Sequence, residues 1–198
     1  MKSPKKSKNI SKDIIQDTKK YIIDTARHLF SEFSYLGVSM NDIAKRLNIT
    51  KAALYYHFTG KKEIYEKVLD NVFEDLSSSL KQALKEDTID KKLHKLIKNY
   101  LNFGLQEKNF IKALILKLPS TNNKITEHIT SLREQIINLI QPVIKEMIKN
   151  KKLSKKVDEK VLTSLLIGMM DGLLLEYSFL NKKINLTKTS NQIIAVLF

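Results

Sequence analysis

No cysteine occurs in this 198-residue chain, and glycine and proline are scarce, with 5 and 3 copies. Without cysteine there can be neither a disulfide framework nor a thiolate metal site. Sheets need many turns, whereas helices joined by short loops need few, so the shortage of turn-forming residues predicts an all-α fold. The hydrophobic content of 42% and the charged content of 28% are those of a folded protein.

The sequence has no segment that predicts export or membrane insertion. The N-terminal lysines have no apolar stretch behind them, which argues against a secretory signal. The longest apolar run, residues 165–180, is interrupted by Asp171 and Glu176 and is shorter than the roughly 20 residues that span a bilayer. We therefore expect a soluble, cytoplasmic protein with no membrane partner.

The chain carries a formal net charge of +14, which favours a polyanionic partner. Because only three of the basic residues are arginines, the excess of lysine is also compatible with a lysine-rich proteome. The distribution of the charge is more informative than its sum. Residues 1–63 carry 13 basic and 6 acidic side chains, a net +7, and the other +7 is spread over about twice that length. We therefore expect the anion-binding end of the molecule near the N-terminus.

Residues 1–10 contain four lysines and one proline, and predict a basic flexible arm. This arm could be an inert solubilising tail or an accessory contact to DNA, for instance in the minor groove. An apolar stripe then predicts a helix that ends near Phe33, followed by a short break over residues 34–37. The stripe consists of Ile22, Ile23, Ala26, Leu29, Phe30 and Phe33.

Two short helices follow, each with its own start signal. Ser39 and Asp42 have the spacing of a capping box, in which each side chain bonds the other residue's amide. Asn48 ends the first helix, because asparagine tolerates a left-handed conformation. Thr50 caps the second helix, residues 51–58. The residues that we expect these helices to bury are Ile43, Ala44 and Leu47, then Leu54 and Phe58.

The rest of the chain predicts only helices and connectors. A long helix opens at Lys61, and Pro142 should kink or split the helix that contains it. Residues 151–156 predict a solvated connector. The further helices are expected over residues 90–106, 109–117, 122–150, 156–179 and 186–197.

Two short capped helices joined by about three residues, after a longer helix, describe a helix-turn-helix. In this motif the second helix enters the major groove, while the first braces it and crosses the phosphate backbone. The small Ala44 lies where the two helices must approach closely. The second helix would expose hydrogen-bonding groups beside small ones, namely Thr50, Lys51, Ala52, Ala53, Tyr56 and His57.

Three strings in this region resemble the signature of the TetR family of transcriptional regulators. They are residues 22–30 (IIDTARHLF), 39–44 (SMNDIA) and 51–58 (KAALYYHF), and the match continues through residues 59–65 (TGKKEIY). The resemblance covers roughly residues 16–76. It implies a DNA-binding domain over residues 11–76, with the helix-turn-helix at 38–57, and a ligand-binding and dimerisation domain over 77–198.

The resemblance also implies a role for each matching position. Ser39 and Asn41 would contact phosphates, and Lys61 would bind a phosphate at the start of the next helix, where the helix dipole adds to its charge. The groove-facing start of the recognition helix would be Thr50, Lys51, Ala52 and Ala53. Tyr55, Tyr56 and His57 would touch phosphates or base edges.

Some positions depart from the family pattern or allow a second interpretation. Ser34 stands where the family usually has Gly, and Ala52 stands where Gly is frequent. Val38 stands where Thr is common, and its lack of a hydroxyl puts one contact in doubt. Ala52 and Ala53 suggest contact with thymine methyl groups. Tyr55 could belong wholly to the core, and His57 could simply end its helix.

The chemistry of the remaining residues argues against an enzyme. No nucleophile–base pair and no phosphate-cradling glycine loop occurs, and His28, His94 and His128, which lack metal-ligand spacing, are expected at the surface. We expect no metal and no cofactor.

The C-terminal half would supply a sensor and a dimer interface. A cavity wall could be formed by Tyr100, Phe103, Phe110, Met147, Met169 and Tyr177, although ordinary core is the favoured interpretation for most of them. Such a lining suits a lipophilic effector, with Asp171 or Glu176 pairing a cation. By resemblance, the last two helices would form the homodimer interface. Gly168 and Gly172 would allow close helix approach there, near Leu173, or would only admit a bulky neighbour within one subunit.

These expectations describe a homodimeric repressor that leaves a palindromic DNA operator when the small-molecule effector binds. The lever would be the helix that opens at Lys61, if its far end around residues 73–80 swings. The alternative is a DNA-binding regulator controlled by a protein or nucleoid partner.

Overall fold

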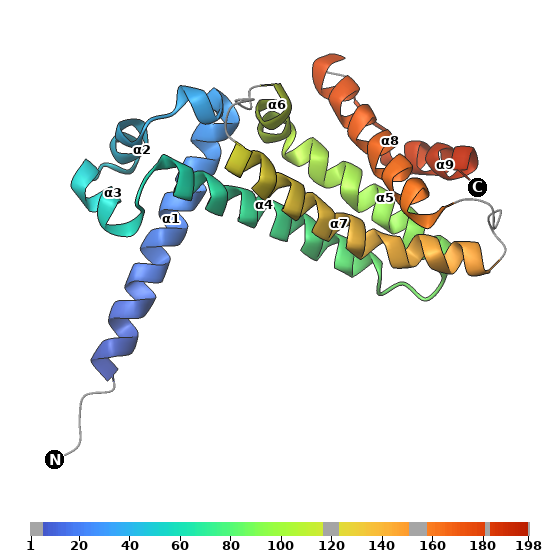
Figure 1. The fold of residues 1–198 in the computed structure, drawn as a ribbon, viewed down its shortest axis with the longest axis horizontal. Helices are drawn as coiled ribbons and strands as arrows, with labels where there is room; N and C mark the ends of the chain where they lie inside the picture. Colours follow the sequence, from blue (N-terminus) through green and yellow to red (C-terminus); the bar gives the residue numbers. More distant parts are fainter. Residues whose placement is uncertain (1–5, 117–122, 151–157, 181–182, 198) are drawn as a thin grey trace. The chain divides into compact units, whose positions relative to one another are not determined.

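The computed structural model describes residues 6–116, 123–150, 158–180 and 183–197, and its regular structure there is entirely helical (Figure 1). The predicted all-α fold is confirmed. The chain divides into two compact units, and the division falls within helix α4 (Lys61–Ala83), between Leu69 and Asp70. The sequence predicted the domain boundary after residue 76, and α4 continues past both positions. The end of α6 from Ala113 groups with the first unit.

The first unit contains α1 (Lys6–Gly37), α2 (Met40–Leu47), α3 (Lys51–His57) and the start of α4. Residues 6–10, which we had placed in a flexible arm, are helical here and continue into α1; residues 1–5 lie outside the described residues. The expected break after Phe33 is present, because Ser34 interrupts α1 with non-helical angles of φ 63° and ψ 174°.

The core of the first unit is formed by the apolar faces that the periodicity predicted. α1 packs against α2, and α2 packs against α3. Ala44 is 2% exposed, as expected of a small residue between closely packed helices. The other side chains buried here include Ile22, Ala26, Phe30, Ile43, Leu47, Leu54, Phe58, Ile64, Tyr65 and Val68.

The second unit contains the rest of α4 and five further helices whose ends lie close to the predicted ones. They are α5 (Ile89–Gln106), α6 (Lys108–Leu116), α7 (Asn123–Lys149), α8 (Glu159–Leu180) and α9 (Leu186–Leu197). Side-chain caps start three of them. Thr88 Oγ1 accepts from Lys91 N at 3.3 Å, Asp158 Oδ1 accepts from Lys160 N at 2.8 Å, and Asn185 Oδ1 accepts from Lys188 N at 2.9 Å. The predicted connector 151–156 lies outside the described residues.

Helix α5 is central to the second unit, because α7, α8 and α9 all pack against it. Gly104 allows the close approach of α5 and α8, since a Cβ at this position would collide with the Leu174 side chain. The fully buried side chains around this contact include Leu93, Leu96, Ile97, Leu101, Ile140, Ile144, Leu166 and Met170. One continuous apolar core therefore holds the second unit together.

Pro142 does not split its helix. Proline removes one intrahelical hydrogen bond and crowds the preceding turn, yet α7 continues from Asn123 to Lys149. Apolar side chains on both sides of Pro142, among them Ile136, Ile140, Val143 and Ile144, are buried in the core. Their burial holds the helix together across the proline, which itself is exposed.

Helix α8 has an unusual amount of apolar surface. With 22 residues, it is the one helix in the described part of the chain long and apolar enough to cross a membrane, by length and composition alone. The expectation that this apolar segment is too short to span a bilayer was therefore wrong. Only 33% of its most apolar 18-residue stretch is buried within the subunit. One face packs on α5, α7 and α9, while Val161, Leu165, Phe179 and Leu180 are each more than half exposed.

Candidate nucleic-acid interface

The first helix of the predicted motif begins with a complete capping box. Asp42 N donates to Ser39 Oγ at 3.2 Å, and Ser39 N donates to Asp42 Oδ2 at 2.9 Å. The Ser39 hydroxyl also donates to Asp42 Oδ2, at 2.6 Å. These bonds lower the pKa of the Asp42 carboxyl, since they stabilise its charged form. The predicted capping box is confirmed.

The turn between α2 and α3 has the expected chemistry. Asn48 is left-handed, with φ 56° and ψ 40°, and Ile49 N donates to Ala44 O at 3.0 Å. Thr50 then caps α3, because its Oγ1 accepts from Ala53 N at 3.1 Å. The three residues Asn48, Ile49 and Thr50 thus turn the chain from the bracing helix into the second helix.

Helix α3 buries one side chain and exposes most of the others. Leu54 is fully buried, whereas Tyr55 is 47% and Tyr56 77% exposed. Tyr55 is therefore not wholly a core residue. Its ring faces Lys51 Nζ at 5.8 Å, within the range of a cation–π contact. Lys51, Ala52 and Ala53 are also exposed, so the structure presents the face that the sequence predicted.

His57 is the last residue of α3, and Phe58 caps the helix end. The His57 ring lies nearly perpendicular to that of Tyr56, with centroids 5.1 Å apart. Its Nδ1 is buried and has no hydrogen-bond partner among the described residues. The side chain is thus half-buried behind Tyr56 rather than fully presented at the surface.

Lys61 has a partner that the sequence did not reveal. Its Nζ donates to the backbone oxygen of Tyr35 at 2.8 Å and lies 4.3 Å from the centroid of the Tyr35 ring. Burial lowers the pKa of Lys61, because the ammonium group loses part of its hydration. The two residues are 26 positions apart, so no local pattern could have paired them.

Two departures from the family pattern have clear structural counterparts. Ser34 occupies the position of a usual glycine and has a positive φ, which costs a residue with a side chain about 1–3 kcal/mol. Val38 is 2% exposed and belongs to the core, so it offers nothing to a ligand in place of a threonine hydroxyl.

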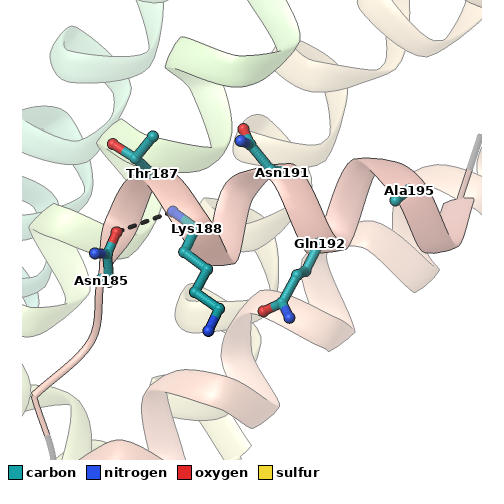
Figure 2. Close-up of a pocket in the computed structure, with 6 residues that line it drawn as sticks. All are labelled: Asn185, Thr187, Lys188, Asn191, Gln192 and Ala195. Atoms are coloured by element: carbon teal, nitrogen blue, oxygen red, sulfur yellow. Dashed lines mark hydrogen bonds between the residues drawn. The ribbon is translucent and has the colours of Figure 1, made fainter.

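The six residues proposed to line an effector cavity do not share one environment. Tyr100 and Met147 belong to the buried core of the second unit, with Phe103 and Met169 packed against its edge. Phe110 is 2% exposed and Tyr177 is half-buried. An open hollow in this unit lies instead along α9 (Figure 2), and five of the six residues that line it have polar side chains: Asn185, Thr187, Lys188, Asn191, Gln192 and Ala195. None of the six predicted residues lines it.

Three polar contacts in the second unit were missed, and all of them join residues distant in sequence. Asp171 accepts hydrogen bonds from Tyr100 Oη at 2.6 Å and from Arg133 Nη2 at 2.5 Å. Its carboxylate is therefore satisfied within the subunit, which corrects our expectation that it could pair a ligand cation. His128 Nε2 lies 2.8 Å from Asp70 Oδ1, so this histidine is not simply a surface residue.

The two glycines of α8 do not accommodate a neighbour within the subunit. Gly168 and Gly172 are exposed, and a Cβ at either position would meet nothing within 4 Å. Leu173 differs from them, because it is partly buried against the subunit's own core. The glycines thus leave the backbone of α8 uncovered at these two positions.

A capped helix-turn-helix whose second helix exposes a basic and aromatic face defines a DNA-binding protein. Comparison with known families agrees with this geometry. Residues 22–68 match the bacterial regulatory proteins of the tetR family, and residues 65–198 match the C-terminal region of YsiA-like proteins. The chain belongs to the TetR family of DNA-binding transcriptional regulators.

Individual proteins similar to this chain are regulators as well. The negative transcriptional regulator IcaR of the biofilm operon icaADBC in Staphylococcus epidermidis is 34% identical over 129 residues, which are 61% of this chain and 68% of IcaR. The fatty acid degradation regulator FadR of Bacillus halodurans has a similar fold, with a TM-score of 0.80 at 17% identity over 90% of this chain and 93% of that one. FadR of Bacillus subtilis, solved in complex with stearoyl-CoA, gives a TM-score of 0.78 at 19% identity over 89% and 95% of the two chains.

Proposed function

We propose that this protein is a homodimeric repressor that reads a near-palindromic operator with helix α3 of each subunit. The observation that carries the proposal is the exposed face of α3, with Lys51, Tyr55 and Tyr56 beside the small Ala52 and Ala53. Small residues let the helix backbone approach the bases, while the lysine and the tyrosine hydroxyls supply donors. A two-fold dimer favours a site with matching symmetry.

The remaining contacts of the head, which is the first unit up to Leu69, follow from the same docking. Ser39 and Asn41 at the exposed start of α2 would face phosphates that flank the groove, while Thr50 belongs to the groove-facing start of α3. The amides at a helix N-terminus favour an anion, which adds to the contact. His57 would contribute through Tyr56, whose ring it supports.

The outer face of α8 supports the homodimer. Val161, Leu165 and Phe179 are each more than half exposed, and they lie on one side of the helix together with Gly168 and Gly172. An apolar strip of this kind, interrupted by glycines, suits close packing against the same strip of a second subunit. Burial in a dimer also explains the high hydropathy of α8 without a membrane, consistent with a cytoplasmic regulator.

For the effector we propose a lipophilic small molecule bound within the second unit. FadR of Bacillus subtilis was solved with stearoyl-CoA, so this fold can hold an acyl chain. Here Phe103 and Met169, partly buried against the apolar core, offer a comparable environment. The lever would be α4, which runs from the head into the second unit. A ligand acts only if it binds one of two dimer arrangements more tightly.

Selection and titration test this function. A random-sequence duplex pool would be selected with the wild-type dimer, and fatty acids, acyl-CoA thioesters and lipophilic cations would be titrated against the complex. We expect an enriched near-palindromic sequence that at least one acyl compound releases. If an operator is selected but none of the compounds releases it, the protein-partner alternative replaces the small effector.

A further inference from the structure

Helix α1 is much longer than the part of it that packs within the head. The buried side chains that the structure describes in α1 run from Ile22 to Ser34, whereas the helix begins at Lys6. Its N-terminal part extends beyond α2 and α3, as Figure 1 shows. At about 1.5 Å per residue, residues 6–18 add about 20 Å of helix. This N-terminal extension is available for a contact outside the head.

Lys19 marks the place where α1 passes the end of α3. Its Nζ lies 5.6 Å from the centroid of the Phe58 ring, within the range of a cation–π contact. Phe58 caps the C-terminal end of α3 and is 3% exposed. The residues before Lys19 therefore continue past this end of the helix that we propose to read DNA.

One face of α1 changes from apolar to basic along the helix. Ala26 and Phe30, four residues apart, are buried on the side of α1 that faces the core of the head. Lys19, Lys12 and Lys8 precede Ala26 at intervals of seven, seven and four residues. Positions at these intervals share one face of a helix. We call Lys8, Lys12 and Lys19 the lysine stripe, which continues the inner face of α1 past the end of α3.

The acidic residues of this region lie on a different face of α1. Asp13, Asp17 and Asp24 form a row of their own, and each follows a lysine of the stripe by five residues, which is roughly 140° around the helix. No lysine of the stripe has an acidic residue three or four positions away, whereas Lys20 has Asp17 and Asp24 at these intervals. The helix thus keeps its acids away from the stripe.

We propose that the lysine stripe binds phosphates of the DNA that flanks the site read by α3, so that α1 extends the DNA interface of each subunit. Helix α3 buries Leu54 towards the core and exposes Lys51 and Tyr56 on the opposite side. Since the inner face of α1 is turned towards α3, the stripe that continues this face lies on the side of a duplex bound to α3. The inference rests on the proposed function in taking α3 as the DNA-reading helix.

The length and the charge of the stripe suit a duplex. From position 8 to position 19 it measures about 16 Å, and the phosphates of one strand are about 3.4 Å apart, so the stripe spans about five nucleotides. Contacts to phosphates carry no sequence information. We therefore expect this part of the interface to lie outside the sequence that the protein selects and to depend strongly on salt.

The experiment compares Lys8→Gln/Lys12→Gln with a control, Lys6→Gln/Lys20→Gln, in the full-length protein. Both variants remove two positive charges from α1, but only the first removes them from the stripe, and glutamine retains a high helix propensity. The probes are the duplex selected by the wild-type protein and the same duplex lengthened at each end by at least about five base pairs of arbitrary sequence. Affinity is measured over a series of salt concentrations, and melting temperatures by circular dichroism.

We expect the stripe variant to bind the longer duplex roughly tenfold more weakly than the wild type. The slope of log affinity against log salt concentration should fall by about 3.6, because two lysines from each of two subunits no longer neutralise phosphates. On the shorter duplex the stripe variant should bind like the wild type. The control variant should stay close to the wild type on both duplexes, and both variants should keep the wild-type melting temperature.

Two results overturn the proposal: equal affinities of the stripe and control variants for the longer duplex, or an equal loss by the stripe variant on both duplexes. If the wild-type protein selects no sequence, the proposed function fails instead. The two variants are then compared on a duplex of random sequence, which still tests the stripe because phosphate contacts do not depend on sequence.

Discussion

Tyr100 and Asp171 form a hydrogen bond of 2.6 Å between α5 and α8, and Arg133 of α7 holds the same carboxylate from the side. The Tyr100 side chain is buried, whereas Arg133 is half exposed. Burial and the neighbouring carboxylate raise the pKa of Tyr100 well above its ordinary value, so its hydroxyl stays protonated and remains a donor. These two hydrogen bonds thus join three helices, α5, α7 and α8.

Replacing Tyr100 with Phe should destabilise the protein by about 2 kcal/mol, because a hydrogen bond to a charged group is lost and Asp171 keeps only its arginine. Tyr177→Phe is the matched control, since the described structure gives its hydroxyl no hydrogen bond. Urea unfolding followed by circular dichroism measures the difference. Equal stabilities of the two variants would mean that the contact adds nothing.

Ser34→Gly should stabilise the protein by about 1 kcal/mol. Glycine adopts a positive φ without strain, and this gain exceeds the entropy that glycine adds to the unfolded chain. Ser31→Gly is the control, because Ser31 lies in the regular part of α1, where glycine should cost about 1 kcal/mol. Thermal unfolding should therefore show shifts of opposite sign, and a destabilised Ser34→Gly would argue against the strained turn.

Acidification should weaken the helix caps of the head. Hydrogen bonds from Ser39 lower the pKa of Asp42 below its ordinary 3.8, and those from Thr59 lower the pKa of Glu63 below its ordinary 4.5. Since both carboxyls have a lower pKa in the folded state, their stabilisation is present above these values and is lost as the pH falls through the lowered ones.

Melting temperatures between about pH 6 and about pH 3 test this effect. Asp42→Asn and Glu63→Gln should each lower the melting temperature near neutral pH and reduce its fall on acidification. Asp24→Asn, which changes an exposed acid outside the caps, should follow the wild-type curve. If all three variants follow that curve, the caps do not contribute as described.

The sequence predicted most of the head because its signals are local. The Ser39–Asp42 box, the left-handed Asn48 and the Thr50 cap each depend on residues at most a few positions apart, and all are present. Contacts between distant residues could not be predicted in this way. The pairing of Lys61 with Tyr35 and that of Tyr100 with Asp171 are set by how the helices pack, which no short spacing encodes.

The body of the molecule shows the same limit. Helix ends were predicted closely, because apolar periodicity marks them, but the supposed cavity wall was only a set of aromatic and methionine residues without a geometry. In the structure Tyr100 and Met147 are ordinary core. Gly168 and Gly172 are exposed because they lie on the face of α8 that turns away from the core. The sequence did not reveal which face this is, because α8 is apolar on nearly all sides.

The homodimer can be tested at Gly172. A glutamate there would place a charge in the proposed interface without touching the subunit's own core, so Gly172→Glu should give a folded monomer. Leu173→Glu, one residue on, should instead lower the stability of the fold itself, because Leu173 packs against the core. Light scattering together with thermal unfolding distinguishes the two. A Gly172→Glu protein that stays dimeric would place the interface elsewhere.

The claim that α3 reads DNA is tested most directly by the affinity of a Lys51→Ala/Tyr56→Ala double variant for the duplex that the wild-type protein selects. Lost base and phosphate contacts should cost about 1–3 kcal/mol for each subunit, hence at least a roughly thirtyfold weaker complex for the dimer. Lys145→Ala on α7 removes one exposed charge from the second unit and serves as the control. We predict that the double variant keeps its circular dichroism spectrum and its dimeric state, loses this affinity and shows a smaller salt slope. A folded double variant that binds the selected duplex as tightly as the wild type would contradict the account.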